Sequence, residues 1–189
     1  RDYEGKSLKD VPDIPVDQDY IIYINSCNFT GCKSEKEGGA ISSGINQEGE
    51  VSGDNDLQIY ECYFIECESG SGGALYFQDG TTEGDEQTII LSCYFVNCYA
   101  TNGEGYAISC RSYDLILGSC RFLKHKRGEN DNSHSILYIE MNEKAPSLDT
   151  CIYEDNSGVS GLTMNVTQSV IVKNFTFQNY HNDDFSQNP

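Results

Sequence analysis

The chain has 189 residues and a formal net charge of −18 at pH 7. This length fits a single domain, and the 38% of residues that are hydrophobic are enough to build a core. The negative charge repels nucleic-acid backbones and anionic membranes, and no stretch approaches the roughly 20 apolar residues of a membrane span. Composition therefore argues against nucleic-acid binding and direct membrane insertion, and it favours cations or basic molecules as partners.

The N-terminal part of the chain differs in composition from the central part. Residues 1–20 are polar and contain two prolines, so we expect an extended arm. Residues 21–180 come next as one folded region, and residues 181–189 form a short polar tail. Because Arg1 is the first residue and no apolar leader comes after it, we interpret the chain as a processed protein or an excerpt of a longer one.

Residues 21–180 repeat one pattern of side chains, in which a cysteine is preceded by a branched aliphatic residue and followed by an aromatic one. The cysteine column contains Cys27, Cys62, Cys93, Cys120, Cys151 and, as a degenerate sixth member, Phe175. The aromatic column, two positions later, contains Phe29, Phe64, Phe95, Phe122, Tyr153 and Phe177. The aliphatic column, three positions earlier, contains Ile24, Ile59, Ile90, Leu117, Leu148 and Val172.

Each repeat predicts three short β strands. Apolar positions alternate with period two before the aliphatic column and again from the cysteine to the aromatic residue, but an odd number of positions separates these two runs. A corner must therefore lie between two strands. A third strand begins with small residues, as in Gly39-Ala40-Ile41 and Gly73-Ala74-Leu75, where glycine permits a tight turn.

These repeats predict an all-β fold, a single-stranded parallel β-helix (solenoid) of about five to six coils, in which like side chains stack about 4.8 Å apart. The aromatic column would form a ladder inside it. The polar segments 44–56, 79–87 and 127–132 differ in length and read as loops at the corners. A β-sandwich would also contain many short strands, but it would not explain the same ordered columns in every repeat.

The Cys-x-Phe unit followed by Gly-Gly-Ala-Ile resembles the repeats of chlamydial polymorphic outer membrane proteins and of similar large surface proteins in parasitic protists. The resemblance covers roughly residues 21–180. It implies a right-handed β-helix at a cell surface that serves adhesion. This sequence places Cys32, Cys67 and Cys98 where that family often has asparagine, and the resemblance does not extend to the family's membrane-anchoring barrel.

Nine cysteines and three N-glycosylation sequons, at Asn28, Asn165 and Asn174, indicate an extracellular or cell-surface protein. Disulfides within each coil would fix the turns and use all the paired cysteines. The expected bonds are Cys27–Cys32, Cys62–Cys67, Cys93–Cys98 and, as a fourth, Cys110–Cys120. Cys151 would then be buried or bonded to another chain. Bonding along the columns is the alternative, although it leaves one cysteine of every three unpaired.

Residues with catalytic or metal-binding potential are sparse. The CxxxxC spacing without a nearby histidine does not suit zinc, and a nucleophilic cysteine would need His125, His134 or His181 as its base. His125 falls in the column of the second cysteine, so we interpret it as a turn residue. The columns on either side of the first cysteine do not stack two acids, as carboxylate chemistry on adjacent coils would require.

Most acidic residues fall in the expected loops, where solvation is the simplest role and weak Ca²⁺ binding a lesser alternative. These residues are Asp54, Asp56, Asp79, Glu83, Asp85, Glu86, Glu129 and Asp131. The basic run at residues 124–127 reads as a solvated turn, or as a contact with an acidic neighbour or a glycan. We expect no cofactor.

We therefore expect an extracellular structural or adhesive β-helix protein that is N-glycosylated and is not an enzyme. Because the two ends of a β-helix present unpaired strand edges, we expect coils to stack end to end into a filament or surface fibre, with the N-terminal arm across the junction. The alternative is a secreted carbohydrate-active enzyme, a polysaccharide lyase or hydrolase. Its site would combine outward carboxylates in register with Arg121 in a groove.

Overall fold

The structure is a computed structural model that describes residues 2–4, 20–43, 55–78, 87–102, 104–111, 114–126, 135–141 and 144–179. Within these residues every helix or strand element is a β strand. The expected loops 44–56 and 79–87 lie almost entirely outside the described residues, as does most of the expected arm. The loop 127–132 and the tail 181–189 lie wholly outside them.

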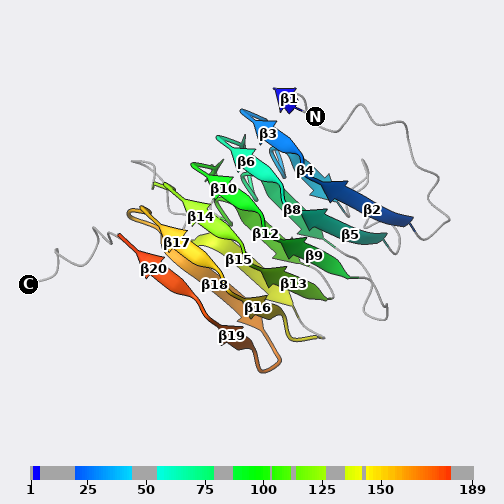
Figure 1. The fold of residues 1–189 in the computed structure, drawn as a ribbon, viewed down its shortest axis with the longest axis vertical. Helices are drawn as coiled ribbons and strands as arrows, with labels where there is room; N and C mark the ends of the chain where they lie inside the picture. The colour runs from blue at the N-terminus through cyan, green and yellow to red at the C-terminus, as the bar shows by residue number, and fades with distance from the viewer. Residues whose placement is uncertain are drawn as a thin grey trace, which may run out of the picture.

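Three parallel sheets, here called A, B and C, run the length of the molecule (Figure 1). Sheet A contains β1 (Asp2–Glu4), β3 (Asn28–Thr30), β6 (Tyr63–Ile65), β10 (Tyr94–Val96), β14 (Arg121–Leu123), β17 (Ile152–Glu154) and β20 (Thr176–Gln178). Sheet B contains β2 (Tyr20–Asn25), β5 (Asn55–Tyr60), β9 (Thr88–Leu91), β13 (Leu115–Gly118), β16 (Ser147–Asp149) and β19 (Ile171–Lys173). Sheet C contains β4 (Ile41–Ser43), β8 (Leu75–Gln78), β12 (Ile108–Arg111), β15 (Ser135–Met141) and β18 (Ser160–Val166). A short pair, β7 (Glu68–Ser69) and β11 (Tyr99–Ala100), lies beside them.

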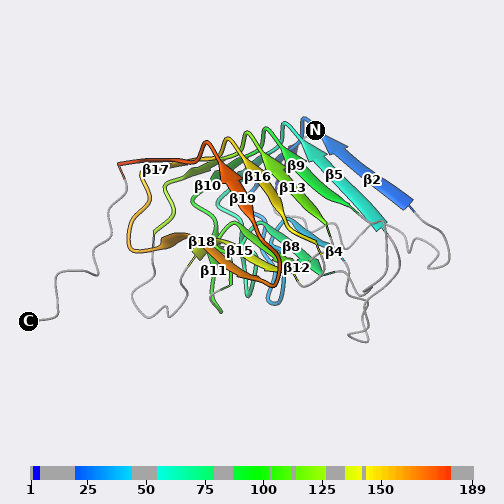
Figure 2. The ribbon, with the colours of Figure 1, turned by 90° about the horizontal axis from the view of Figure 1, so that it is seen from below.

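The chain is an all-β parallel β-solenoid. It passes from sheet B to sheet A and then to sheet C in each repeat, so that Figure 2 shows sheets B and C as opposite faces around a common interior. All strand pairs between successive repeats are parallel, which rules out the sandwich alternative for the described residues. The register also keeps each predicted column intact, pairing Ile59 with Ile24 on one side and with Ile90 on the other.

The corner predicted from the odd spacing is a single residue in the left-handed region. It lies between sheets B and A in every repeat, with φ from 52° to 57° at Ser26, Glu61, Ser92, Ser119, Thr150 and Asn174. One left-handed residue reverses the inward and outward alternation of the strand, so both the aliphatic and the aromatic columns point inward. The tight turn before sheet C uses Gly38, Gly72 and Gly105, also at positive φ, where a Cβ would collide with the backbone of Ile41, Leu75 and Ile108.

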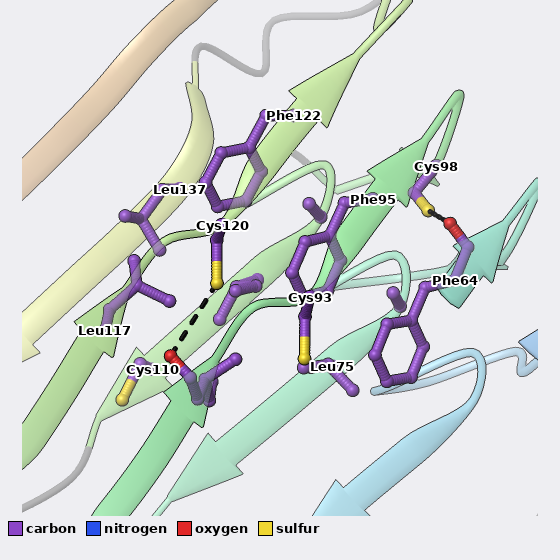
Figure 3. Close-up of a cluster of buried hydrophobic side chains, with 14 of the residues drawn as sticks. Phe64, Leu75, Cys93, Phe95, Cys98, Cys110, Leu117, Cys120, Phe122 and Leu137 are labelled. Carbon is purple, nitrogen blue, oxygen red and sulfur yellow. Dashed lines mark hydrogen bonds between the residues drawn. The ribbon is translucent and has the colours of Figure 1, made fainter. Parts of the chain in front are cut away.

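The aromatic column forms the predicted ladder through the core (Figure 3). Phe64 stacks on Phe29 and on Phe95, with ring centroids 5.0 Å apart in both pairs and interplanar angles of 2° and 6°. The stack continues through Phe122 to Tyr153 and ends at Phe177, 4.9 Å from Tyr153. Each ring except the last is buried. The continuous interior that the repeat predicted is confirmed.

The first strand of sheet A comes from the segment that the sequence suggested was an arm. β1 pairs in parallel with β3, and its register sets Tyr3 opposite Phe29. Tyr3 therefore occupies the backbone position of a further aromatic-column residue. The sequence carried a signal for this, because Tyr3 and Gly5 have the spacing of Phe29 and Gly31.

Candidate functional site

Eight of the nine cysteines form two columns of thiols, while Cys110 lies apart from both on β12 of sheet C, and the structure contains no disulfide. All nine cysteines lie in the described residues, and the structure contains none of the expected bonds Cys27–Cys32, Cys62–Cys67, Cys93–Cys98 and Cys110–Cys120. In the first three pairs a strand of sheet A separates the two cysteines. At about 3.3 Å per residue this strand keeps the Cα atoms on the order of 10 Å apart, whereas a disulfide needs about 4.4–6.8 Å. The spacing between coils, about 4.8 Å, fits only the alternative connectivity along a column.

Backbone carbonyls of the preceding coil accept hydrogen bonds from these thiols. Cys120 Sγ lies 3.6 Å from the Ile90 carbonyl oxygen, and Cys98 Sγ lies 3.4 Å from that of Phe64 (Figure 3). Burial raises the pKa of Cys151 to about 11. The hydrogen bond from Cys93, together with burial, raises the pKa of Cys62 further still. Cys62 and Cys151 are therefore protonated at neutral pH, and the buried cysteines pack as small apolar groups.

His125 and Asn156 continue the second cysteine column as a buried polar pair. Asn156 Oδ1 accepts the backbone N–H of His125 at 2.8 Å and lies 3.2 Å from its Nδ1, while Asn156 Nδ2 donates to the Phe122 carbonyl at 2.9 Å. His125 Nε2 is buried and has no hydrogen-bond partner among the described residues. Burial lowers the pKa of His125 to about 4. The interpretation of His125 as a member of the repeat column is confirmed, whereas His134 and His181 lie outside the described residues.

A charged cluster on the outer face of sheet C was not predicted. Arg111 forms ion pairs with Glu104 at 2.8 Å and Glu140 at 2.9 Å, and its guanidinium lies 5.9 Å from the ring centre of Tyr138. Burial alone would lower the pKa of Arg111, but the two carboxylates raise it. One cation thus contacts both acids, which leaves the cluster with one net negative charge, and the pair with Glu140 links β12 to β15.

The expected enzyme constellation around Arg121 contains a single carboxylate. Arg121 pairs with Glu154 of the next coil at 2.8 Å and lies over the ring of Tyr94. No group of three histidine, cysteine or acidic residues in the described part of the chain could hold a metal ion. Of the acids expected in the loops only Asp56 is described, so the expected Ca²⁺ binding by these loops falls outside the described residues. The Asp56 carboxylate accepts a hydrogen bond from the backbone N–H of Gln87.

An open groove of about 410 Å³ crosses the corner between sheets B and A. Its lining residues are Ser26, Asn28, Glu61, Tyr63, Ser92 and Tyr94. The two tyrosine rings stack with centroids 4.7 Å apart at an angle of 11°. Asn28, the first sequon residue, is exposed beside them, and Asn165 and Asn174 are also exposed on the outside of the solenoid. All three sequons are thus at positions that a glycan can reach.

The C-terminal end of the solenoid exposes residues that belong to the core columns. Val172 is 41% exposed and Phe177 is 53% exposed, whereas their counterparts in the preceding coil, Leu148 and Tyr153, are at most 1% exposed. At the other end of sheet B, Ile24 is only partly buried. Each end therefore presents part of the apolar interior together with the edges of its sheets.

The fold and these surfaces define a repeat protein of the parallel β-solenoid class. Comparison with known proteins adds no closer assignment, because no family model, no curated protein and no solved structure matches the chain. Among the described residues no helix is long and apolar enough to cross a membrane.

Proposed function

We propose that the chain is an extracellular structural and adhesive protein, N-glycosylated, whose right-handed solenoid of five to six coils stacks end to end with that of a second copy. The observation that carries this proposal is the exposure of Val172 and Phe177 at the C-terminal end. A further coil with the same columns would cover both side chains in the way that each coil covers its neighbour.

The strand β1 supports strand addition as the mode of assembly. It pairs with the edge of sheet A although residues 5–19, which connect it to β2, are not described. The edge of sheet A at β3 can therefore pair with a further parallel strand that has an aromatic residue at its centre. In a head-to-tail stack the edge of β20 would meet β1 of the next copy, with Phe177 at the position next to Tyr3.

The distribution of charge also favours contact between ends. Residues 156–179 contain a single charged residue, Lys173, and residues 20–43 contain two lysines and two glutamates. The coils at 156–179 and 20–43 are therefore close to neutral in a chain whose net charge is −18, although β1 adds Asp2 and Glu4 at the N-terminal edge of sheet A. Repulsion between whole chains would keep them apart laterally, while ends with so few charges can approach.

Catalysis is not part of the proposal. On the outer surface Glu104 and Glu140 both pair with Arg111, and Glu154 is paired with Arg121. An acid–base mechanism would need one of these carboxylates to be available for a substrate. The geometry supports a role of these pairs in holding neighbouring coils together.

Sedimentation velocity over a range of protein concentrations tests the assembly. The unmodified chain should show a mass that rises with concentration, and the variant Val172→Asp/Phe177→Asp should remain monomeric because it places charge on the docking surface. A matched control, Gln58→Asp/Ser119→Asp, adds the same charge in the middle of the solenoid and should assemble normally. A monomeric unmodified chain at every concentration, or equal assembly of both variants, would refute the proposal.

A further inference from the structure

One outer column of sheet A contains a sequon asparagine, Asn28, with Tyr63 in register on one side and Asp2 of β1 on the other. Asn28 pairs in register with Tyr63, Tyr63 with Tyr94, and Tyr94 with Arg121. The Arg121 guanidinium lies 5.8 Å from the Tyr94 ring centre, so Tyr94 is covered on one face by Arg121 and on the other by Tyr63. Tyr63 is 42% exposed, and the side of its ring that faces Asn28 borders the groove.

The geometry points to a glycan on Asn28 whose first sugar packs against the ring of Tyr63. In-register residues of parallel strands lie about 4.8 Å apart and project from the same face. A sugar attached to Asn28 Nδ2 would therefore lie beside the Tyr63 ring at the spacing of the ladder. The C–H bonds on one face of a pyranose suit the negatively charged face of an aromatic ring. The stack would then read sugar, Tyr63, Tyr94, Arg121.

The groove also supplies polar groups for the sugar. Ser26 Oγ lies 3.3 Å from a carboxylate oxygen of Glu61, and both side chains line the groove with Ser92. These groups can accept and donate hydrogen bonds to the N-acetyl and hydroxyl groups of N-acetylglucosamine, the first sugar of an N-linked glycan. A groove of about 410 Å³ is within the range of small-molecule binding sites.

The other two sequons lack such a platform. Asn165 pairs in register with Glu140, and its Nδ2 lies 3.4 Å from the Glu140 carboxylate. Asn174 donates to the Asp149 carboxylate at 2.9 Å. In the described residues Asn28 is thus the one sequon asparagine whose in-register neighbour is aromatic. A glycan on Asn174 would have no aromatic stacking partner, so this sequon is a control for the glycan on Asn28.

This inference rests on the proposed extracellular location, since the modification belongs to the secretory pathway. The transfer forms a bond between Asn28 Nδ2 and C1 of the sugar, breaks the bond from C1 to a lipid pyrophosphate donor, and releases the proton of the amide nitrogen. The glycan is added to a surface position and needs no rearrangement of the core, because Phe29 between Asn28 and Thr30 already points inward.

A double-mutant cycle in a eukaryotic secretory host tests the contact. The background Asn165→Gln/Asn174→Gln leaves Asn28 as the acceptor, and trimming with an endoglycosidase leaves one N-acetylglucosamine. Removing the sequon with Asn28→Gln should lower Tm by about 2–4 °C relative to the trimmed protein, the shift expected for a contact of about 1 kcal/mol in a chain of this size. In the presence of Tyr63→Leu the same comparison should show no difference.

The reference for a glycan without a platform is Asn28→Gln/Asn165→Gln, which keeps Asn174 and should gain no stability from its sugar. An equal Tm gain with and without Tyr63→Leu, no gain in the Tyr63 background, or an Asn28 that mass spectrometry finds unmodified would each overturn the inference. Sedimentation of the Phe177 variant reports separately on end-to-end assembly. Failure of the glycan contact can therefore be distinguished from failure of the proposed function.

Discussion

Acid should destabilise this solenoid through one buried side chain, His125. In the folded chain burial holds its pKa near 4, whereas in the unfolded chain it returns to about 6.5. Well above pH 6.5 neither state binds the proton, and stability is unaffected by this group. As the pH falls from 6.5 towards 4 the unfolded state takes up the proton first, so the free energy of unfolding falls.

The size of the effect is set by the two pKa values. One pKa unit corresponds to about 1.4 kcal/mol, so the shift from 6.5 to about 4 limits the loss to about 3.4 kcal/mol, of which about 2 kcal/mol is lost between pH 8 and pH 5. The structure supplies the reason, because Asn156 accepts from Nδ1 and a proton on Nε2 would find no acceptor among the described residues.

Urea unfolding at pH 8 and pH 5 measures this loss. The matched variant is His125→Asn, which places in the column the residue that the next coil has at Asn156 and does not titrate in this range. The pH dependence of the unmodified chain should exceed that of the variant by about 2 kcal/mol. Carboxylates elsewhere titrate equally in both proteins and cancel. Identical pH dependence in the two proteins would show that His125 is not buried and neutral.

Three further predictions address packing. In a denaturant titration Phe95→Ala should lower the free energy of unfolding by about 3–5 kcal/mol, because its ring is buried. Phe177→Ala should lower it by less than about 2 kcal/mol, because its ring is half exposed. Equal losses would contradict a ladder that ends in solvent. Gly73→Ala should lower the free energy of unfolding by about 3 kcal/mol, because the new Cβ would collide with backbone oxygens of the adjacent coil. Gly31→Ala should lower it by only about 1 kcal/mol, because the Cβ would meet open space and only the positive φ is unfavourable. Thermal unfolding of the two variants measures the difference. A thiol reagent should modify the partly buried Cys27 first and the buried cysteines only after unfolding, and fast reaction of all nine would show that the columns are open.

Much of the fold could be predicted from the sequence, because in a solenoid residues at equivalent positions of successive repeats stack on one another, and their spacing along the chain shows where strands and corners lie. The odd step between Ile59 and Cys62 already required the corner that the structure places at Glu61. The stack of Phe64 between Phe29 and Phe95 is a consequence of the same alignment, since strands in register bring equal positions together.

Other features could not be read from the columns. In the Arg111 cluster only the contact with Glu104 is of this kind, because Glu104 lies in the turn before β12 and has no fixed place in the columns. Arg111 and Glu140 each come three positions after a column residue, Ile108 and Leu137, so their pairing follows from the register. The disulfide expectation treated CxxxxC as a turn, but three of the four residues between the cysteines form a strand of sheet A, and only the fourth, at positive φ, turns the chain. Strand length is set by the stack of neighbouring coils, which a single repeat does not reveal.

Electron microscopy of the concentrated chain tests the central claim most directly. Stacking through Val172 and Phe177 predicts unbranched rods one solenoid wide, with the axial spacing of about 4.8 Å continuing across each junction. Single particles at every concentration, or rods that persist when both residues are replaced by aspartate, would contradict it.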